Sequence, residues 1–585
     1  MSAESIRRLF EEAEESIYYM HPSKGLMATI TVSKGKGEDE DETEDVRIAS
    51  VFEIMGRVRD PNGEGWARLL RWRDADKLWH SHAVSDASLH GDPTALCSEL
   101  ASRGLEITTG KHRPHLIHYL NQAETPHRLT EVPTTGWQDV AGKKIFVLPE
   151  QIIGAAKGEK VIVRGAADNS PFESQGTLAD WKTSICWVAH AHSRAVFAIS
   201  AAFSAPLLKR VGMEGGGFHL YGRSSIGKTT LIRAAASVWG KGATDPGFVR
   251  SWRSTANHLE AVAALHTDTI LPLDELGVVE AKEAAATVYS LTSGVGKGRA
   301  NREGYARRSL TWRVIVLSSG EIRLTDKLVE DRRRPHVGQQ VRLVDIPADA
   351  GAGFGVFDSG GEDGDSQTLA DQIKTAAQTY FGTAGPEFVR KLIAEGDPGK
   401  INQMIKLFRR NAPKDPDGQV LRVVDRFGLV AAAGELTIQF GIVPWAPGAA
   451  IKAARVCLDA WFNDRGGAGA GEEMAAISQV RLFIEKHGEA RFDKVNTTDN
   501  IPIRDRAGWR RGDGDAQEWL ILPETWKTDI CAGLNPTAVA KALAARGMLK
   551  PDSKGGYSRP ERIAGNQKPI RVYVVTMAIL TEAEQ

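Results

Sequence analysis

The feature that most constrains this chain is a loop at Gly222–Thr229, Gly-Arg-Ser-Ser-Ile-Gly-Lys-Thr. It fits the phosphate-binding pattern GxxxxGK[ST] at every fixed position. An apolar strand is predicted before it at Phe218–Tyr221, and a helix after it at Thr230–Trp239. Such a loop offers backbone N–H groups and a helix N-terminus to a phosphate, in conformations that a Cβ would block at the glycines. The sequence therefore predicts a parallel α/β nucleotide-binding sheet.

The loop residues are expected to bind ATP together with Mg²⁺. Lys228 is predicted to reach the β and γ phosphates, and the Thr229 hydroxyl to contact the metal. The expected nucleotide-binding set is Gly222, Arg223, Ser224, Ser225, Ile226, Gly227, Lys228, Thr229, Thr230 and Asp274.

Two adjacent acids end a second apolar run, Thr269–Glu275, about 45 residues further on. Asp274 is predicted to hold Mg²⁺ through its water shell, and Glu275 to accept a proton from the attacking water. Such a run alone is more often a plain strand end. Combined with the phosphate loop, it predicts a catalytic acid pair.

A third apolar run, Trp312–Glu321, ends in polar residues. Ligands of a parallel sheet bind beyond the carboxyl ends of its strands. Ser319, or its neighbour Ser318, is therefore predicted to orient the lytic water, although a plain strand end has the same pattern.

Composition limits the class of protein. Lys+Arg and Asp+Glu both total 74, which excludes a uniformly basic coat but allows a basic channel offset by acidic surface. The four cysteines lie far apart in sequence, as suits a reducing cytoplasm. No apolar stretch is long enough to span a bilayer, so a cytoplasmic location without a membrane partner is expected.

The motifs, in this order, resemble the AAA+ fold of hexameric replicative helicases, especially the minichromosome maintenance (MCM) family. From about residue 46 onward the chain is also similar to a helicase-like domain of phages, plasmids and genomic islands, long catalogued without a function. The stretches that carry this similarity are LYGRSSIGKTTL, GKGRANREG, VLSSGE, GQQVRLVDIPAD and VRLFIEKHGEARF.

The resemblance implies an α/β fold with an AAA+ P-loop NTPase core and a helical lid. A small α+β domain precedes the core, and a winged-helix-like domain follows the lid. The expected divisions are a flexible segment at 1–45, the α+β domain at 46–175, the core at 176–350, a linker at 351–366, the lid at 367–462, a linker at 463–473 and the C-terminal domain at 474–585.

Three further roles come from the resemblance alone. Between the acid pair and Ser319, MCM-like motors carry a DNA-gripping hairpin, so Lys297 is the expected tip and Arg299 the alternative. Arg302, Arg307 and Arg308 follow, and a solvated basic loop remains the competing interpretation.

Arg342, in Val341–Asp345, is the expected finger toward a neighbouring subunit's ATP, with Arg332–Arg334 as alternatives. Arg422 is the expected sensor 2 residue at the start of a lid helix. An ordinary surface or ion-paired arginine is the competing interpretation of Arg342. The family's sensor Asn is a Ser here, which has a shorter reach.

The expected function is an ATP-dependent DNA helicase or translocase that forms a homo-oligomeric ring, a hexamer, for replication of a mobile element. Single-stranded DNA would pass through the pore, and the C-terminal domain could bind duplex. One alternative is an ATP-switched DNA-binding initiator or helicase loader without unwinding activity. A weaker one is a protein-remodelling ATPase.

Two other clusters have plainer explanations. His112, His115 and His118 recur at spacing three near His127 and Cys97, but no CxxC or HxxxH completes a zinc site. A helix packed on the small sheet is expected instead. Basic residues at 509–511 and 554–562 could contact phosphates or be surface charge.

Overall fold

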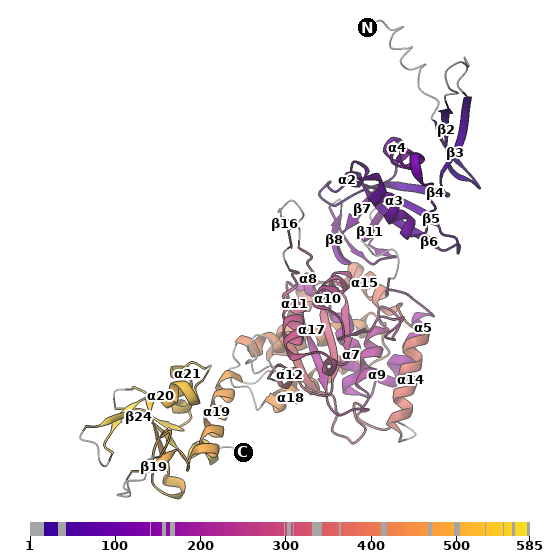
Figure 1. Cartoon of the computed structure of the whole chain (residues 1–585). Helices are drawn as coiled ribbons and strands as arrows, with labels where there is room; N and C mark the ends of the chain where they lie inside the picture. Colours follow the sequence, from indigo (N-terminus) through magenta and orange to yellow (C-terminus); the bar gives the residue numbers. More distant parts are fainter. Residues whose placement is uncertain are drawn as a thin grey trace.

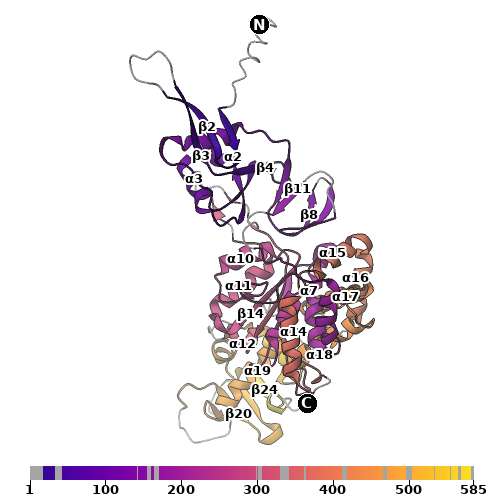
Figure 2. The ribbon, with the colours of Figure 1, turned by 90° about the vertical axis from the view of Figure 1, so that its right-hand side faces the viewer.

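The computed structural model describes residues 17–32, 42–140, 142–154, 160–163, 170–297, 299–300, 306–307, 309–329, 342–361, 364–410, 418–465, 471–495, 503–532, 534–553, 555–563 and 568–581. The N-terminal strands lie at one end of the molecule, a large α/β core in the middle and the C-terminal domain at the other end (Figures 1 and 2). No helix of these residues has the length and apolar character that a membrane span needs.

The first strands begin well before residue 46. They are β1 (Tyr18–His21), β2 (Gly25–Val32) and β3 (Glu42–Ala49), paired antiparallel in that order. The expectation of a flexible segment over 1–45 is therefore wrong for the described part. The end of the acidic run also pairs in β3, because its acids alternate with Thr43 and Val46 along an exposed strand.

A five-stranded sheet, ordered β11-β7-β4-β5-β6, forms the centre of the N-terminal domain. Its strands are β4 (Phe52–Arg59), β5 (Ala67–Arg73), β6 (Trp79–Ser85), β7 (Arg128–Val132) and β11 (Lys160–Val163). Leu70 and Trp72 on one face pack against helices α3 (Pro93–Ser102) and α4 (Pro114–Gln122). The predicted small α+β domain is present.

The central sheet has the order β13-β14-β17-β12-β18, and all its neighbouring strands are parallel. The strands are β12 (Gly216–Tyr221), β13 (Arg250–Ser251), β14 (Ile270–Asp274), β17 (Ile315–Gly320) and β18 (Leu343–Pro347). Since helices cover both faces, β14 and β17 are buried along their whole length and are apolar up to their polar carboxyl ends. The predicted parallel α/β sheet is confirmed.

Alternate residues of these strands enter two separate cores. Ile270, Ile315 and Leu317 face the larger core, while Leu271, Leu273 and Val316 face the smaller one. The larger core includes α7 (Ser193–Ser204), α9 (Lys228–Ala236), α14 (Ser366–Thr379), α15 (Ala384–Glu395), α16 (Pro398–Arg410), α17 (Gly418–Gln439) and α18 (Ala449–Arg465). The smaller core includes α10 (Ala256–Leu265), α11 (Ala281–Ser293) and α12 (Leu324–Val329). Figure 2 shows α10 and α11 on one side of β14, with α7 and α17 on the other.

The C-terminal domain contains the predicted helices and final strand, together with strands that the sequence did not indicate. Its elements are α19 (Gly471–His487), β19 (Phe492–Lys494), β20 (Gly508–Arg511), β21 (Glu518–Ile521), α20 (Pro523–Thr525), α21 (Pro536–Ala545), β22 (Leu549–Lys550), β23 (Arg559–Glu561) and β24 (Ile570–Thr576). The helix–helix–strand order was expected, whereas the antiparallel β20–β21 pair is an addition.

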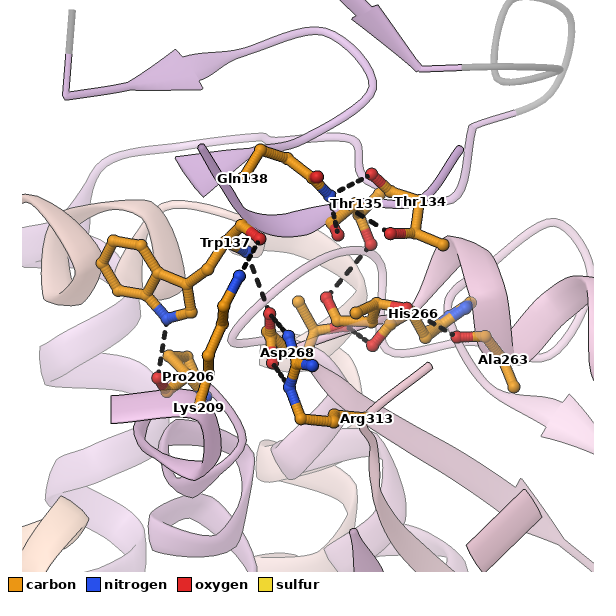
Figure 3. A network of polar contacts seen from close by, with 12 residues as sticks. Thr134, Thr135, Trp137, Gln138, Pro206, Lys209, Ala263, His266, Asp268 and Arg313 are labelled. Atoms are coloured by element: carbon orange, nitrogen blue, oxygen red, sulfur yellow. Dashed lines mark hydrogen bonds and ion pairs between the residues drawn. The ribbon is translucent and has the colours of Figure 1, made fainter. Parts of the chain in front are cut away.

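A small sheet, β8 (Gly136–Val140), β9 (Lys143–Val147) and β10 (Ile152–Ile153), docks the N-terminal domain on the core. Its first turn enters a polar network around the buried Asp268, drawn in Figure 3. The Trp137 backbone N–H donates to Asp268 at 2.9 Å, and the Thr135 hydroxyl donates to the Thr267 carbonyl at 3.1 Å. The Trp137 indole donates to the Pro206 carbonyl at 2.8 Å, which adds a contact to the helical side of the core.

Candidate functional site

The phosphate loop has the predicted context, between the end of β12 and the start of α9. Gly227, the residue before α9, has φ +99°, and a Cβ there would lie 2.8 Å from Val356. Glycine is needed at this position because of both its conformation and its close neighbour. Ser225 also has a left-handed φ of 62°. The loop is therefore wound into a shape that aims backbone N–H groups inward.

Lys228 occupies the position expected for phosphate binding. Its Nζ donates to the Gly222 carbonyl at 2.9 Å and to the Arg223 carbonyl at 2.5 Å. Burial lowers its pKa, and the nearby Glu321 and Asp274 carboxylates oppose that shift. The ammonium is thus held over the loop, where a phosphate could replace the carbonyls as its partner.

The acid pair lies directly beside this loop. Asp274 ends β14 and accepts hydrogen bonds from the Thr229 hydroxyl, at 3.3 Å, and from the Ser319 hydroxyl. Glu275 follows with φ 65°, a left-handed conformation that is uncommon for a residue other than glycine. Such strain is often stored at functional sites, and here it turns the Glu275 side chain away from the path of the strand.

The two adjacent serines at the end of β17 face opposite sides of the sheet. Ser319 contacts Asp274, and its Oγ also accepts the Glu275 backbone N–H at 3.4 Å. Ser318 instead contacts His219 Nδ1 at 2.9 Å and accepts from the Trp252 indole at 2.8 Å. Of the two alternatives, only Ser319 lies with the acid pair.

These residues line a pocket of about 990 Å³. Besides the predicted loop, its wall includes Arg233 of α9, residues 353–355 and Phe357, and the first turns of α14. The α14 residues are Ser366, Gln367, Ala370, Asp371 and Lys374. The sequence analysis did not identify any of these as part of the site.

The predicted linker at 351–366 accounts for much of this omission. Its first part packs on the phosphate loop, because the Val356 N–H donates to the Ile226 carbonyl at 2.9 Å. Gly355 has φ +65°, and a Cβ there would lie 2.5 Å from the Ile226 carbonyl oxygen. The glycines that suggested flexibility instead allow close approach of two backbones.

The end of this pocket is also tied to the last turn of α18. Asp464 accepts from the Tyr221 hydroxyl at 2.6 Å and from Arg323 at 2.5 Å. Tyr221 is the last residue of β12, directly before the phosphate loop, and Arg323 follows the β17 strand by three residues. One carboxylate therefore joins both strand ends to the helix that leads into the C-terminal domain.

The oxygen atoms at the site fit a magnesium ion. Asp274 and Thr229 supply a carboxylate and a hydroxyl within hydrogen-bond distance of each other, and Mg²⁺ prefers such ligands with water and phosphate completing its shell. Among the described residues, no group of three or more His, Cys, Asp or Glu could hold a metal by itself. The histidines of α4 instead bond to the Tyr18 hydroxyl, at 2.9 Å from both His115 and His118.

Arg342 and Arg422 lie away from this pocket. Arg342 precedes β18, and its carbonyl accepts the Gly217 N–H at 2.8 Å, at the amino ends of the strands. Its guanidinium stacks on Tyr289 at 4.9 Å. Arg422 is exposed on α17, one turn before Arg426, which is buried against Gly216 at the same edge. The alternatives Arg332–Arg334 lie outside the described residues.

A hairpin follows α11, as predicted, but Lys297 is not at its tip. The strands β15 (Arg299–Ala300) and β16 (Ala306–Arg307) pair Arg299 with Arg307. Lys297 therefore precedes the first strand, with its N–H directed at Glu260 at 3.4 Å. Its side chain is exposed, and within the described part of the chain it makes no ion pair. The side chains of Arg299, Arg302, Arg307 and Arg308 lie outside the described residues.

The basic cluster at 509–511 is mostly engaged within its own domain. Trp509 is buried, and Arg511 pairs with Glu518 at 2.7 Å and with Glu561 at 2.8 Å. Arg510 contacts Glu489 at 3.5 Å. These pairs favour the surface-charge interpretation for Arg511 in particular.

Comparison with known proteins agrees with this geometry. A solved structure described as "SCCmec type IV Cch - active helicase" aligns with a TM-score of 0.71 at 18% identity, over 97% of this chain and 99% of that one. A second, NtrX from Brucella abortus, aligns with a TM-score of 0.16 at 11% identity, over 41% of this chain and 64% of that one, which is too low to indicate a shared fold. No curated protein sequence matches the chain.

Residues 21–311 match the family described as "Domain of unknown function (DUF927)". The matched range includes the N-terminal domain, the phosphate loop and the acid pair. The chain therefore carries a domain of the DUF927 family, within a fold that it shares with the Cch structure over nearly its whole length.

Proposed function

We propose that this protein is an ATP-dependent DNA helicase or translocase of the AAA+ type, acting as a ring in the replication of a mobile genetic element. The observation that carries the proposal is the meeting of Thr229, Asp274 and Ser319 beside the phosphate loop. The full-length likeness to a structure whose title reads "active helicase" supports the choice of motor.

In this proposal each side chain acts on a different part of the reaction. Lys228 neutralises charge on the β and γ phosphates, and Asp274 with Thr229 holds the Mg²⁺ that bridges them. Glu275 accepts the proton of the attacking water. Ser319 is within reach to orient that water, and its hydrogen bond to Asp274 fixes the side chain in place.

The placement of Arg342 and Arg422 supports action between subunits. Both lie at the amino ends of the strands, whereas their own phosphate loop lies at the carboxyl ends. A finger on that edge can complete only the site of a neighbouring copy. We therefore propose a closed ring, with six subunits by analogy with the MCM family.

Two regions are proposed to contact DNA. The β15–β16 hairpin would face the pore, where Lys297 and Arg299 supply positive charge. The C-terminal domain, with α21 followed by β22–β24, has the element order of a winged helix and would bind duplex or regulate the ring.

The test is strand displacement on 5′-tailed and 3′-tailed duplexes, with and without ATP. Wild-type protein should displace a strand from one of the two substrates, and Glu275→Gln should not. ATP-dependent duplex binding without displacement on either substrate would instead identify an initiator or loader.

A further inference from the structure

The β5–β6 hairpin of the N-terminal domain presents a tryptophan to solvent. Trp79, at the start of β6, is 46% exposed, although most tryptophans of the chain are buried. Two guanidinium groups lie against its ring, with Arg71 at 4.0 Å and Arg73 at 4.5 Å from the ring centroid. An exposed aromatic ring between cations is typical of surfaces that bind single-stranded nucleic acid.

Strand register explains why these three side chains meet. Arg73 pairs with Trp79, and Arg71 pairs with Ser81, so their side chains share one face of the sheet. The alternate residues Trp72 and His80 point the other way and stack on each other at 6.0 Å. The cluster is therefore built on two paired strands and not on a loop.

The turn of this hairpin is held by its own hydrogen bonds. Asp74 accepts the Leu78 N–H at 2.9 Å and contacts His80 Nε2 at 2.8 Å, and Lys77 has a left-handed φ of 67°. A ring presented on a fixed turn needs little ordering on binding, which lowers the entropic cost of a contact.

A pocket of about 340 Å³ opens beside the ring. Of its charged residues, Arg47 is paired with Glu106 at 2.6 Å, and Asp74 is engaged in the turn. Within the described residues, Arg71 and Arg73 make no ion pair. Glu53 lies opposite Arg71 on β4 and would repel an anion there, which leaves the Arg73 side for a phosphate.

We propose that Trp79, Arg71 and Arg73 form a binding site for single-stranded DNA, separate from the ring's pore. One base would stack on the exposed indole, and a neighbouring phosphate would contact the Arg73 guanidinium. The identity of the ligand rests on the proposed function. The site itself rests on the cluster.

The observations favour DNA over a protein segment at this site. Leu78, 61% exposed, is the large apolar neighbour at the turn, and an apolar peptide interface would need a wider patch. The two cations instead match a polyanion with flat bases. Binding of a protein is therefore an outcome of the test below.

The experiment uses the full chain without ATP. Fluorescence anisotropy measures binding of a labelled 30-nucleotide oligo-dT at several salt concentrations to wild type, Trp79→Ala, Trp79→Phe and Arg71→Ala/Arg73→Ala. Trp187→Ala is the matched control, since Trp187 is 61% exposed on the core and stacks on His190 without an arginine contact. Thermal unfolding checks that each variant is folded.

Trp79→Ala should weaken binding roughly 10-fold, and Trp79→Phe should restore most of the loss, because a phenyl ring still stacks. The double arginine variant should flatten the salt slope by about 1.4, the value for two phosphate contacts on a single strand. Trp187→Ala should bind as wild type, and DNA-independent ATPase should be unchanged in every variant.

A second readout is photo-crosslinking of an oligonucleotide that contains 5-iodouracil, which should attach to the peptide that contains Trp79. Wild-type affinity and slope in the Trp79 and arginine variants, with no crosslink there, would overturn the site, and a protein partner would then be sought. Trp79-dependent binding by a protein that displaces no strand would overturn the proposed function and leave the site standing.

Discussion

Asp268 and Arg313 form a two-pronged ion pair directly ahead of two neighbouring strands of the central sheet. Arg313 Nε lies 2.9 Å from Oδ1 of Asp268, and Nη2 lies 3.0 Å from Oδ2. Asp268 precedes β14 by two residues, and Arg313 precedes β17 by two. Since the carboxylate also accepts the Trp137 N–H, the pair joins the N-terminal domain to the strands that carry Asp274 and Ser319 (Figure 3).

Arg313→Ala should destabilise this junction, because it leaves a buried carboxylate without its counter-ion. Breaking such a pair costs about 3 kcal/mol, which corresponds to a fall of about 5–10 °C in the first thermal transition. Arg390→Ala, which removes an exposed pair with Glu387 on α15, is the control and should change the transition little. Equal melting curves for the two variants would contradict the role of Asp268.

Lys228→Ala should abolish nucleotide binding, because the β and γ phosphates lose their main cation. Glu275→Gln should keep ATP bound and stop turnover, since the base is lost while Asp274 and Thr229 remain. Binding of a fluorescent ATP analogue and a phosphate-release assay separate the two effects. Wild-type turnover in Glu275→Gln would exclude it as the base.

Ser319→Ala and Ser318→Ala should have different effects although the residues are adjacent. Ser319→Ala removes the hydroxyl beside Asp274 and should lower phosphate release about 10-fold or more at nearly unchanged ATP affinity. Ser318→Ala leaves buried partners on His219 and Trp252 unsatisfied and should cost about 1–3 kcal/mol of stability. Phosphate release and thermal unfolding of both variants measure this; the reverse pattern would exchange their roles.

Arg342→Ala should leave ATP affinity nearly intact and reduce hydrolysis about 10³-fold or more, as loss of a trans finger does. Mixing it with Lys228→Ala protein tests the direction of action. A mixed interface has one intact loop facing one intact arginine, so some hydrolysis should return. No recovery in confirmed mixed rings would place Arg342 outside the neighbouring site.

Lys297→Ala should flatten the salt dependence of single-strand binding and reduce unwinding more than basal ATP hydrolysis. One phosphate contact per engaged subunit is lost, while the nucleotide pocket is unchanged. Binding at several salt concentrations, ATP hydrolysis and strand displacement are the measurements. An unchanged slope with unchanged unwinding would return Lys297 to a solvated position at the base of the hairpin, and Arg299 would be tested next.

The phosphate loop and the acid pair could be predicted because their chemistry is local. A strand, a loop with Gly227 and a helix are contiguous, and Asp274 ends an apolar run. The wall formed by Phe357 and α14 could not be predicted, since its approach to the loop depends on tertiary packing. Gly355 was the available signal, but a glycine needed for close approach has the same sequence appearance as one in a linker.

The choice between Ser318 and Ser319 also needed the structure. Successive residues of a strand face opposite sides, and the sequence does not say which side holds the nucleotide. Lys297 was misplaced for a similar reason, because the hairpin register, with Arg299 opposite Arg307, depends on backbone pairing.

The position of Asp464 has a mechanical consequence. A single carboxylate at the end of α18 holds the last residue of β12 and the segment after β17, the two places where a γ-phosphate would be sensed. Loss of the phosphate that shifted either segment would pull on the same oxygen, and α18 would behave as a lever arm with its far end in the C-terminal domain. Fuel consumption and the pose of that domain would thus be geared through one side chain.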